Sequence, residues 1–196
     1  PRRAVTLMLK GKRLGFADLA EPRSINGGKP SYGARIIIET DDADVKAIDA
    51  AIKEVAEAQW KDKAGTVLDL LEEKGRIAFS KKPYRNSKGE VYKAFEGKFS
   101  LGVSAPTTKR PTYFDEYGNP IDSPEKVAAK LYAGCYVNMK VEFYPLLRDD
   151  GNRINCAVLG VMFAGDGESF GGGAPVASAD DFSGMAKERA NADDLL

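Results

Sequence analysis

The segment KKPYRNSKGEVYK, residues 81–93, gathers basic and aromatic side chains that together could bind a polyanion carrying flat rings. Five of its residues are Lys or Arg, one is Glu and two are Tyr. The wider stretch from Arg76 to Tyr113 holds nine basic residues and only two acidic ones. Cationic side chains bind phosphates and release counterions, whereas aromatic rings stack on unpaired bases. Because a duplex hides its base faces, the pattern favours a single-stranded nucleic acid; an ordinary solvated hairpin is the alternative.

Strand alternation separates the rings of this stretch into core residues and ligand contacts. If residues 90–102 form one strand, its outer face carries Tyr92 and Lys98. Its inner face then carries Val91, Phe95, Phe99 and Leu101. Tyr136 and Lys140 repeat the Tyr/Lys pattern on a later strand, where a solvated face is an equal alternative. The predicted DNA contacts are Arg35, Lys81, Lys82, Tyr84, Arg85, Tyr92, Lys93, Lys98, Lys109, Arg110, Tyr113, Tyr136 and Lys140.

The zero net charge of the chain hides an asymmetry between its body and its tail. Residues 164–196 hold seven acidic and two basic residues, a net charge of −5, so residues 1–163 carry +5. The tail places apolar side chains beside acids twice, at Asp180, Asp181 and Phe182 and again at Asp193, Asp194, Leu195 and Leu196. A tethered acidic arm can lie in a basic groove when DNA is absent and recruit partners when DNA is bound. A tail that only keeps the protein in solution is the alternative.

The composition argues against catalysis and against a metal site. The chain has no histidine, which removes Cys/His zinc sites and Ser-His-Asp triads. The acidic residues in predicted turns lack the spacing that would converge on a metal. Cys135 and Cys156 lie in apolar runs, so we predict buried free thiols and a reducing compartment. We expect no enzyme activity, no metal and no cofactor, and no apolar run approaches the ~20 residues of a membrane helix.

Two kinds of hydrophobic periodicity indicate the elements that must position these residues. Alternation predicts strands at 4–10, 31–40, 76–80, 90–104, 135–147 and 152–164, with a turn at 86–89 and an irregular ribbon at 108–121. Helical spacing predicts helices at 41–60, 66–75 and 123–132. The core face of the strand 135–147 takes Cys135, Val137, Met139, Val141 and Phe143. Composition changes after Phe163, which predicts a folded domain at 1–164 and a flexible Gly-rich linker and acidic tail at 165–196.

Three segments in this order resemble a known family. YGARIIIE (residues 32–39) leads into a predicted helix, LYAGCYVNMKVEFYPL (131–146) is a strand led by a glycine, and AVLGVMF (157–163) precedes a linker with three consecutive glycines and an acidic end. The chain resembles the bacteriophage-encoded single-stranded DNA-binding proteins with an OB fold, the replication-type proteins of podoviruses and their relatives. Tails of that family are usually more acidic and end in an aromatic residue, whereas this one ends in Leu195-Leu196 and Lys187 and Arg189 interrupt its acids.

The resemblance implies a barrel that grips single strands through aromatic and basic side chains in the cytoplasm of an infected host cell. It also implies an acidic arm that contacts replication partners, often polymerase or helicase, and sometimes supports formation of a homo-oligomer. We predict a mainly β (α+β) fold, a five-stranded OB-type barrel with inserted helices and a disordered acidic tail. The predicted function is sequence-tolerant binding of single-stranded DNA in phage replication or recombination. A self-assembling structural barrel and an RNA-binding regulator are the alternatives.

Overall fold

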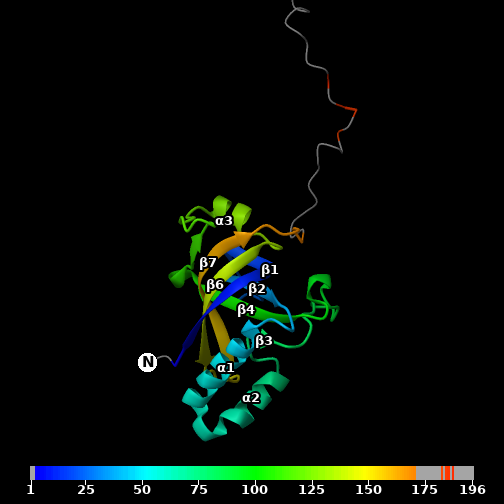
Figure 1. The fold of residues 1–196 in the computed structure, drawn as a ribbon. Coiled ribbons are helices and arrows are strands. Elements are labelled where there is room, and N and C mark those ends of the chain that lie inside the picture. Colours follow the sequence, from blue (N-terminus) through cyan, green and yellow to red (C-terminus); the bar gives the residue numbers. More distant parts are fainter. Residues whose placement is uncertain (1–2, 171–181, 183, 186, 188–196) are drawn as a thin grey trace, which may run out of the picture.

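Five strands close into a barrel in the computed structural model, which describes residues 3–170, 182, 184, 185 and 187 (Figure 1). They are β1 (Val5–Arg23), β2 (Ser31–Ile38), β4 (Phe99–Pro106), β6 (Tyr136–Leu146) and β7 (Arg153–Gly165). The ring runs β1–β2–β4–β7–β6 and returns to β1. Its pairs are antiparallel except β4 and β7, which run parallel where Ser104 meets Ala157. This closed five-stranded arrangement confirms the predicted OB-type barrel.

The first strand is long enough to serve two sides of the barrel. Its first part pairs with β6, from Val5 to Arg13, and its second part pairs with β2, from Arg13 to Arg23. Register shifts between Leu9 and Lys12 and between Leu14 and Phe16 bend it between these partners. The predicted strand at 4–10 is therefore only the first part of β1, because the strand continues through both register shifts to Arg23.

Helices cover both ends of the barrel (Figure 1). After β2, α1 (Asp44–Trp60), the short 3-10 helix η1 (Lys61–Lys63) and α2 (Ala64–Glu73) lie at one end. The predicted helical spacing of α1 is confirmed, since Ile48, Ile52 and Val55 are buried. At the other end α3 (Pro124–Lys130) starts where the hydroxyl of Ser123 accepts a hydrogen bond from the Lys126 N–H at 3.3 Å, as the sequence predicts.

The start of α1 is tied to β1 by a buried lysine. The Lys12 ammonium lies 2.8 Å from a carboxylate oxygen of Asp42 and 2.7 Å from one of Asp44. Burial would lower the pKa of Lys12, but hydrogen bonds to the two carboxylates outweigh it and raise the pKa. Burial would likewise raise the pKa of Asp42, but the hydrogen bond from Lys12 leaves it lowered. Both groups therefore stay charged, and the ion pair fixes the helical end against the barrel.

The core lies inside the barrel and confirms the predicted inner face of β6. The five alternate residues of that predicted face, from Cys135, which directly precedes β6, to Phe143, have no exposed surface. Cys135 and Cys156 are buried and unpaired, as predicted. Burial raises the pKa of the Cys135 thiol to about 11, and it raises that of Cys156 as well. Both thiols are therefore protonated and shielded from reagents.

The segment between α2 and β4 differs from the predicted pair of strands. Only β3 (Phe79–Ser80) is extended in the first half, and the 3-10 helix η2 (Lys93–Phe95) replaces the first part of the predicted strand 90–104. Gly97 has φ +67°, which interrupts extended backbone before β4 begins. The turn at 86–89 is confirmed, since Asn86 N–H donates to the Glu90 carbonyl and Gly89 N–H to that of Asn86.

The predicted ribbon at 108–121 also has little regular structure. It contains a 3-10 helix η3 (Thr107–Lys109) and a three-residue strand β5 (Thr112–Phe114) that runs parallel to β7. β3 and β5 extend the sheet beyond the barrel as its two edges. No helix among the described residues is long and apolar enough to cross a membrane.

The chain stays in contact with the barrel after β7 ends at Gly165. Residues 166–170 lie across its surface, where the Tyr132 hydroxyl donates to Asp166 at 2.7 Å and Phe170 N–H donates to the Ala133 carbonyl at 3.1 Å. The Arg13 guanidinium donates to the Glu168 carbonyl and lies 4.3 Å from the centre of the Phe170 ring. Glycine at 134 permits this contact, because a Cβ there would lie 2.1 Å from the Glu168 carbonyl oxygen.

Most of the predicted tail motifs lie outside the described residues. Phe182 is described and exposed. The others are Asp180, Asp181, Asp193, Asp194, Leu195 and Leu196.

Candidate nucleic-acid interface

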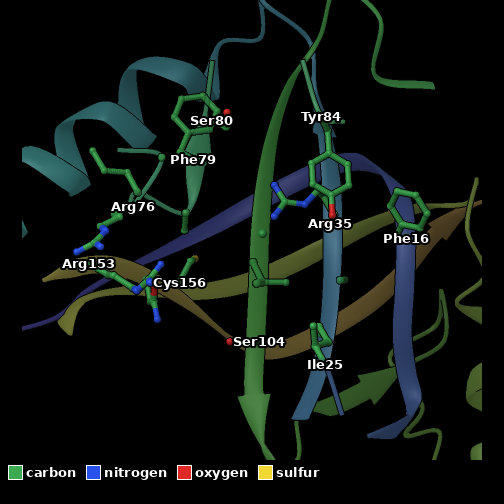
Figure 2. Close-up of a pocket in the computed structure, with 18 of the residues that line it drawn as sticks. Phe16, Ile25, Arg35, Arg76, Phe79, Ser80, Tyr84, Ser104, Arg153 and Cys156 are labelled. Carbon is green, nitrogen blue, oxygen red and sulfur yellow. The ribbon is translucent and has the colours of Figure 1, made fainter. Parts of the chain in front are cut away.

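A groove of about 730 Å³ crosses β2 and β4 on the outside of the barrel. Arg76, Phe79 and Ser80 lie on one side of β4, and Tyr84, Phe16 of β1 and Ile25, which follows β1, lie on the other side (Figure 2). Arg35 of β2 and Ser104 of β4 line its floor. We call this surface the basic groove, because only two acids, Asp18 and Glu72, line it beside six arginines and lysines: Arg23, Arg35, Arg76, Lys81, Lys82 and Arg153.

Four rings pack together at one end of the basic groove and form an aromatic cluster. Tyr84 and Tyr92 are stacked with their centres 5.3 Å apart, and Phe16 meets Tyr92 edge-on at 4.9 Å. Phe95 is 1% exposed and supports the others from below, whereas Phe16 is 39% exposed. Gly15 makes room for this support, since a Cβ there would lie 2.3 Å from the Phe95 ring. The cluster is thus a rigid platform with exposed ring surface.

Arg35 lies at the edge of this cluster and has no carboxylate partner in the part of the chain that the structure describes. Its guanidinium carbon is 4.0 Å from the centre of the Tyr84 ring, and its Nη1 donates to the Ser100 hydroxyl at 3.1 Å. Gly102 leaves space for it, because a Cβ there would lie 2.8 Å from Nη2. Burial lowers the pKa of Arg35, yet an arginine in a protein stays protonated. No ion pair among the described residues includes Arg35, so its charge is free to attract an external anion.

Two further guanidiniums lie at the other end of the basic groove. Figure 2 shows Arg76 and Arg153 on one side of β4, with Arg35, Tyr84 and Phe16 on the other. Arg76 donates to the neutral carbonyl of Asp150 at 3.1 Å. The described part of the chain offers neither Arg76 nor Arg153 a carboxylate within ion-pair distance. Neutral acceptors fix such side chains in place and leave their positive charge uncompensated.

The structure brings five of the predicted contacts together in the basic groove. They are Arg35, Lys81, Lys82, Tyr84 and Tyr92. Lys81 also forms an ion pair of 2.9 Å with Asp49 of α1, so a phosphate would have to compete for it. Tyr92 was predicted on an extended strand and instead precedes η2, which turns its ring onto Tyr84.

Other predicted contacts lie near the basic groove but have other partners. The Arg85 guanidinium donates to the Gly89 carbonyl within its own turn, and Lys98 pairs with Glu39. Lys93 belongs to η2, next to the aromatic cluster. None of these three lines the basic groove.

The remaining predicted contacts point elsewhere. Tyr113 is 3% exposed, and burial strongly raises the pKa of its hydroxyl, so the structure places this ring in the core and not on the surface. Arg110 lies over the Tyr113 ring, and Lys109 ends η3. Tyr136 and Lys140 are on the outward face of β6 and do not line the basic groove.

The predicted contacts did not include Phe16, Arg76 and Arg153 of the basic groove. Arg153 is distant in sequence from the basic stretch, and Phe16 is a single ring in a part of β1 that was not predicted as a strand. Arg76 belongs to the basic stretch but lies at its margin, before the hairpin. Gly15, which precedes Phe16 in the sequence LGF, is the only local signal that a ring packs closely against this part of β1.

Among the residues that the structure describes, no three His, Cys, Asp or Glu side chains are placed to hold a metal ion.

Comparison with known proteins gives one family and a consistent fold. A family model described as Enterobacter phage Enc34, ssDNA-binding protein, matches residues 5–196. Protein p50 of Acyrthosiphon pisum secondary endosymbiont phage 1 is 30% identical over 184 residues, which cover 92% of this chain and 94% of that protein.

Two solved structures of the bacteriophage Enc34 single-stranded DNA-binding protein have similar folds. The one in complex with ssDNA has a TM-score of 0.69 at 19% identity, over 87% of this chain and 95% of that chain. Another has a TM-score of 0.66 at 19% identity, over 93% of this chain and 95% of that chain.

Proposed function

The chain belongs to the family of the Enterobacter phage Enc34 ssDNA-binding protein, and from this membership we propose that it binds single-stranded DNA in the basic groove. The observation that carries the proposal is the position of Arg35. Its guanidinium, which has no ion-pair partner among the described residues, lies against the half-buried ring of Tyr84 in the aromatic cluster, so one place offers both a phosphate ligand and aromatic surface. A surface that only kept the protein in solution would not need a half-buried cation.

The aromatic cluster and the arginines have separate roles in this proposal. Bases stack on Phe16, Tyr84 and Tyr92, each worth about 1–3 kcal/mol. Phosphates lie along Arg35, Arg76 and Arg153, with the lysines of residues 81–82 at the rim. Neither a ring face nor a phosphate distinguishes one base from another, so binding tolerates any sequence. The duplex buries its base faces and binds more weakly.

The biological role that fits this chemistry is protection of single strands during phage replication or recombination, without catalysis, in the cytoplasm of the infected cell. The acidic residues of the tail compete with DNA for the basic groove or recruit a polymerase, a helicase or a recombination protein. The tail's net charge of −5 against the body's +5 supports this competition. The effective concentration of a tethered segment makes weak contacts of this kind sufficient.

Fluorescence anisotropy with labelled oligonucleotides tests the proposal. One sequence is titrated as single-stranded DNA, as duplex and as RNA, at low and at high salt, with the full chain and with a chain ending at Phe170. We expect tight binding to the single strand that weakens steeply with salt, and tighter binding without the tail. Arg35→Met should lose most of this affinity, whereas Lys46→Met, on the exposed face of α1, should not. Equal affinities for Arg35→Met and the unchanged chain would refute the basic groove as the site, and a strong preference for RNA would refute the DNA assignment.

A further inference from the structure

A second groove, of about 520 Å³, lies on the outer face of β1, β5, β6 and β7. It shares no lining residue with the basic groove. The side chains that dominate it are Met8, Lys10, Asn138, Lys140, Leu159 and Met162. We call it the methionine groove.

The methionine groove combines apolar surface with two lysines that have no ion-pair partner among the described residues. Met8 is 55% exposed, and Leu159 is exposed too, which is unusual for neighbouring large apolar side chains on one sheet face. Lys140 is the ladder partner of Met8 on β1 and of Gly160 on β7, so its ammonium borders the apolar surface. No ion pair between described residues includes Lys10 or Lys140. The ligand that fits is a peptide with apolar side chains next to carboxylates.

Nucleic acid does not fit the methionine groove as well as such a peptide. Its only ring belongs to Phe114, which is half-buried, and it has no arginine. Stacking on bases needs exposed flat rings, whereas methionine side chains adapt to aliphatic partners. The chemistry therefore separates this surface from the basic groove, although both are positive.

The sequence contains a segment with the required chemistry. Residues 193–196 are Asp-Asp-Leu-Leu, two carboxylates followed at once by two branched apolar side chains. We propose that this segment of the chain docks in the methionine groove, with the leucines on Met8 and Leu159 and the aspartates beside Lys10 and Lys140. The charges are complementary, two against two.

The chain can reach the methionine groove easily. Phe170 packs on Arg13, which is the ladder partner of Tyr136. Tyr136 is four positions from Lys140 on β6, about 13 Å at the rise of a strand. The 22 residues of 171–192 span up to about 70 Å when fully extended. A tether of this length keeps the segment at a high local concentration near its site.

This inference does not depend on DNA binding. It concerns a different surface, and it leaves the acids at 180 and 181 available to compete in the basic groove. Docking of residues 193–196 would hold the end of the tail on the surface of the barrel. The segment would be released only by a partner that binds the leucines more tightly.

Methyl NMR of the full chain, with ¹³C-labelled methionine methyl groups and a spin label at Ala192→Cys, tests the docking. The label attaches only at this position, because Cys135 and Cys156 are buried. The chain has four methionines, and Met8 and Met162 report on the methionine groove. We expect the Met8 and Met162 signals to lose most of their intensity when the label is paramagnetic. Met185, close to the label in sequence, is the positive control.

Two variants make the result specific. Leu195→Ser with Leu196→Ser, and separately Lys10→Glu with Lys140→Glu, should restore the Met8 and Met162 signals. Lys46→Glu, the matched change on α1, should leave them broadened. Unchanged Met8 and Met162 intensities in the unaltered tail, or broadening that survives both double variants, would overturn the proposal. Broadening that disappears on dilution would show that the contact is between molecules and would overturn docking within one molecule. Failure of DNA binding would not affect any of these outcomes.

Discussion

The basic groove and the methionine groove are both positive, but they place their charges on different apolar surfaces. The basic groove combines guanidiniums with stacked rings, from Arg35 and Tyr84 at one end to Arg76 and Arg153 at the other. The methionine groove combines two ammonium groups with thioether and aliphatic side chains. Guanidiniums and rings suit phosphates and bases, whereas lysines beside aliphatic groups suit an acidic, leucine-containing peptide.

Backbone support differs between the two grooves as well. Gly15 and Gly102 let Phe95 and Arg35 lie flat against the strands of the basic groove, so its side chains are held in fixed positions. Met8 of the methionine groove stands on regular strand and Lys10 lies at the register shift between Leu9 and Lys12, and no glycine contact of this kind among the described residues holds either side chain. A rigid site loses little entropy on binding, and a flexible one can adapt to its ligand. Net charge alone therefore does not identify the ligand of a surface.

Loss of the rings of Tyr84 and Tyr92 should have the largest effect on DNA affinity. Only the basic groove should be affected. Tyr84→Ala combined with Tyr92→Ala removes two stacking surfaces, and we expect a loss of about 2–4 kcal/mol, roughly 30- to 700-fold in affinity for single-stranded DNA. Anisotropy titration measures it, and thermal unfolding checks that the fold is kept. Tyr136→Ala, an exposed ring outside the basic groove, is the matched control. An equal loss for Tyr136→Ala would move the DNA path onto β6 and end the separation of the two grooves.

Loss of the distal arginines should have the next largest effect. We expect Arg76→Gln and Arg153→Gln each to reduce the slope of log K against log salt by about 0.7, the value for one phosphate contact with a single strand. Affinity should fall equally for all sequences, since phosphates carry no base pattern. Titrations at several salt concentrations give the slope. The same measurement on Lys10→Gln should return the slope of the unchanged chain, and a reduced slope there would contradict the assignment of phosphates to the basic groove only.

Sequence predicted those parts of the molecule in which local periodicity decides the structure. The inner face of β6 and the Ser123 cap of α3 follow from alternation and from capping chemistry, and both are confirmed. The strand prediction was wrong for residues 90–98, because Gly97 takes a positive φ and the alternation of apolar residues does not reveal such a backbone conformation. The burial of Tyr113 could not be predicted, because the direction of a three-residue strand depends on its pairing with β7.

Sequence predicted only some of the residues that line the basic groove, because the others are brought there by contacts between distant segments. Tyr84 and Tyr92 were found because they lie within a basic stretch of sequence. Phe16 and Arg153 come from β1 and β7, and only closure of the barrel brings them to the same groove. The methionine groove was not predicted at all, although Lys140 was selected, because its apolar residues come from three strands, β1, β5 and β7.

A moderate effect should follow from filling the space beneath Arg35. Gly102→Ala places a methyl group 2.8 Å from Nη2, which displaces the guanidinium from Tyr84 without removing its charge. We expect a loss of about 1 kcal/mol, roughly 5-fold in affinity, with the salt slope unchanged. Gly65→Ala, where a Cβ meets nothing, controls for the added methyl group. Unchanged affinity in Gly102→Ala would mean that the position of Arg35 against the ring is not part of the binding site.

The smallest effect should come from the methionine groove, and it should depend on the tail. Lys10→Glu with Lys140→Glu changes charges that solvent screens beyond about 8 Å at physiological salt, so the direct effect on DNA in the basic groove is slight. If residues 193–196 dock beside these lysines, the double change also frees two aspartates to compete with DNA. We therefore expect affinity for single-stranded DNA to fall about 2-fold in the full chain, within the range of weak exposed charge interactions. The same change in a chain ending at Phe170 should have no effect, and an equal fall in both chains would show that the tail takes no part.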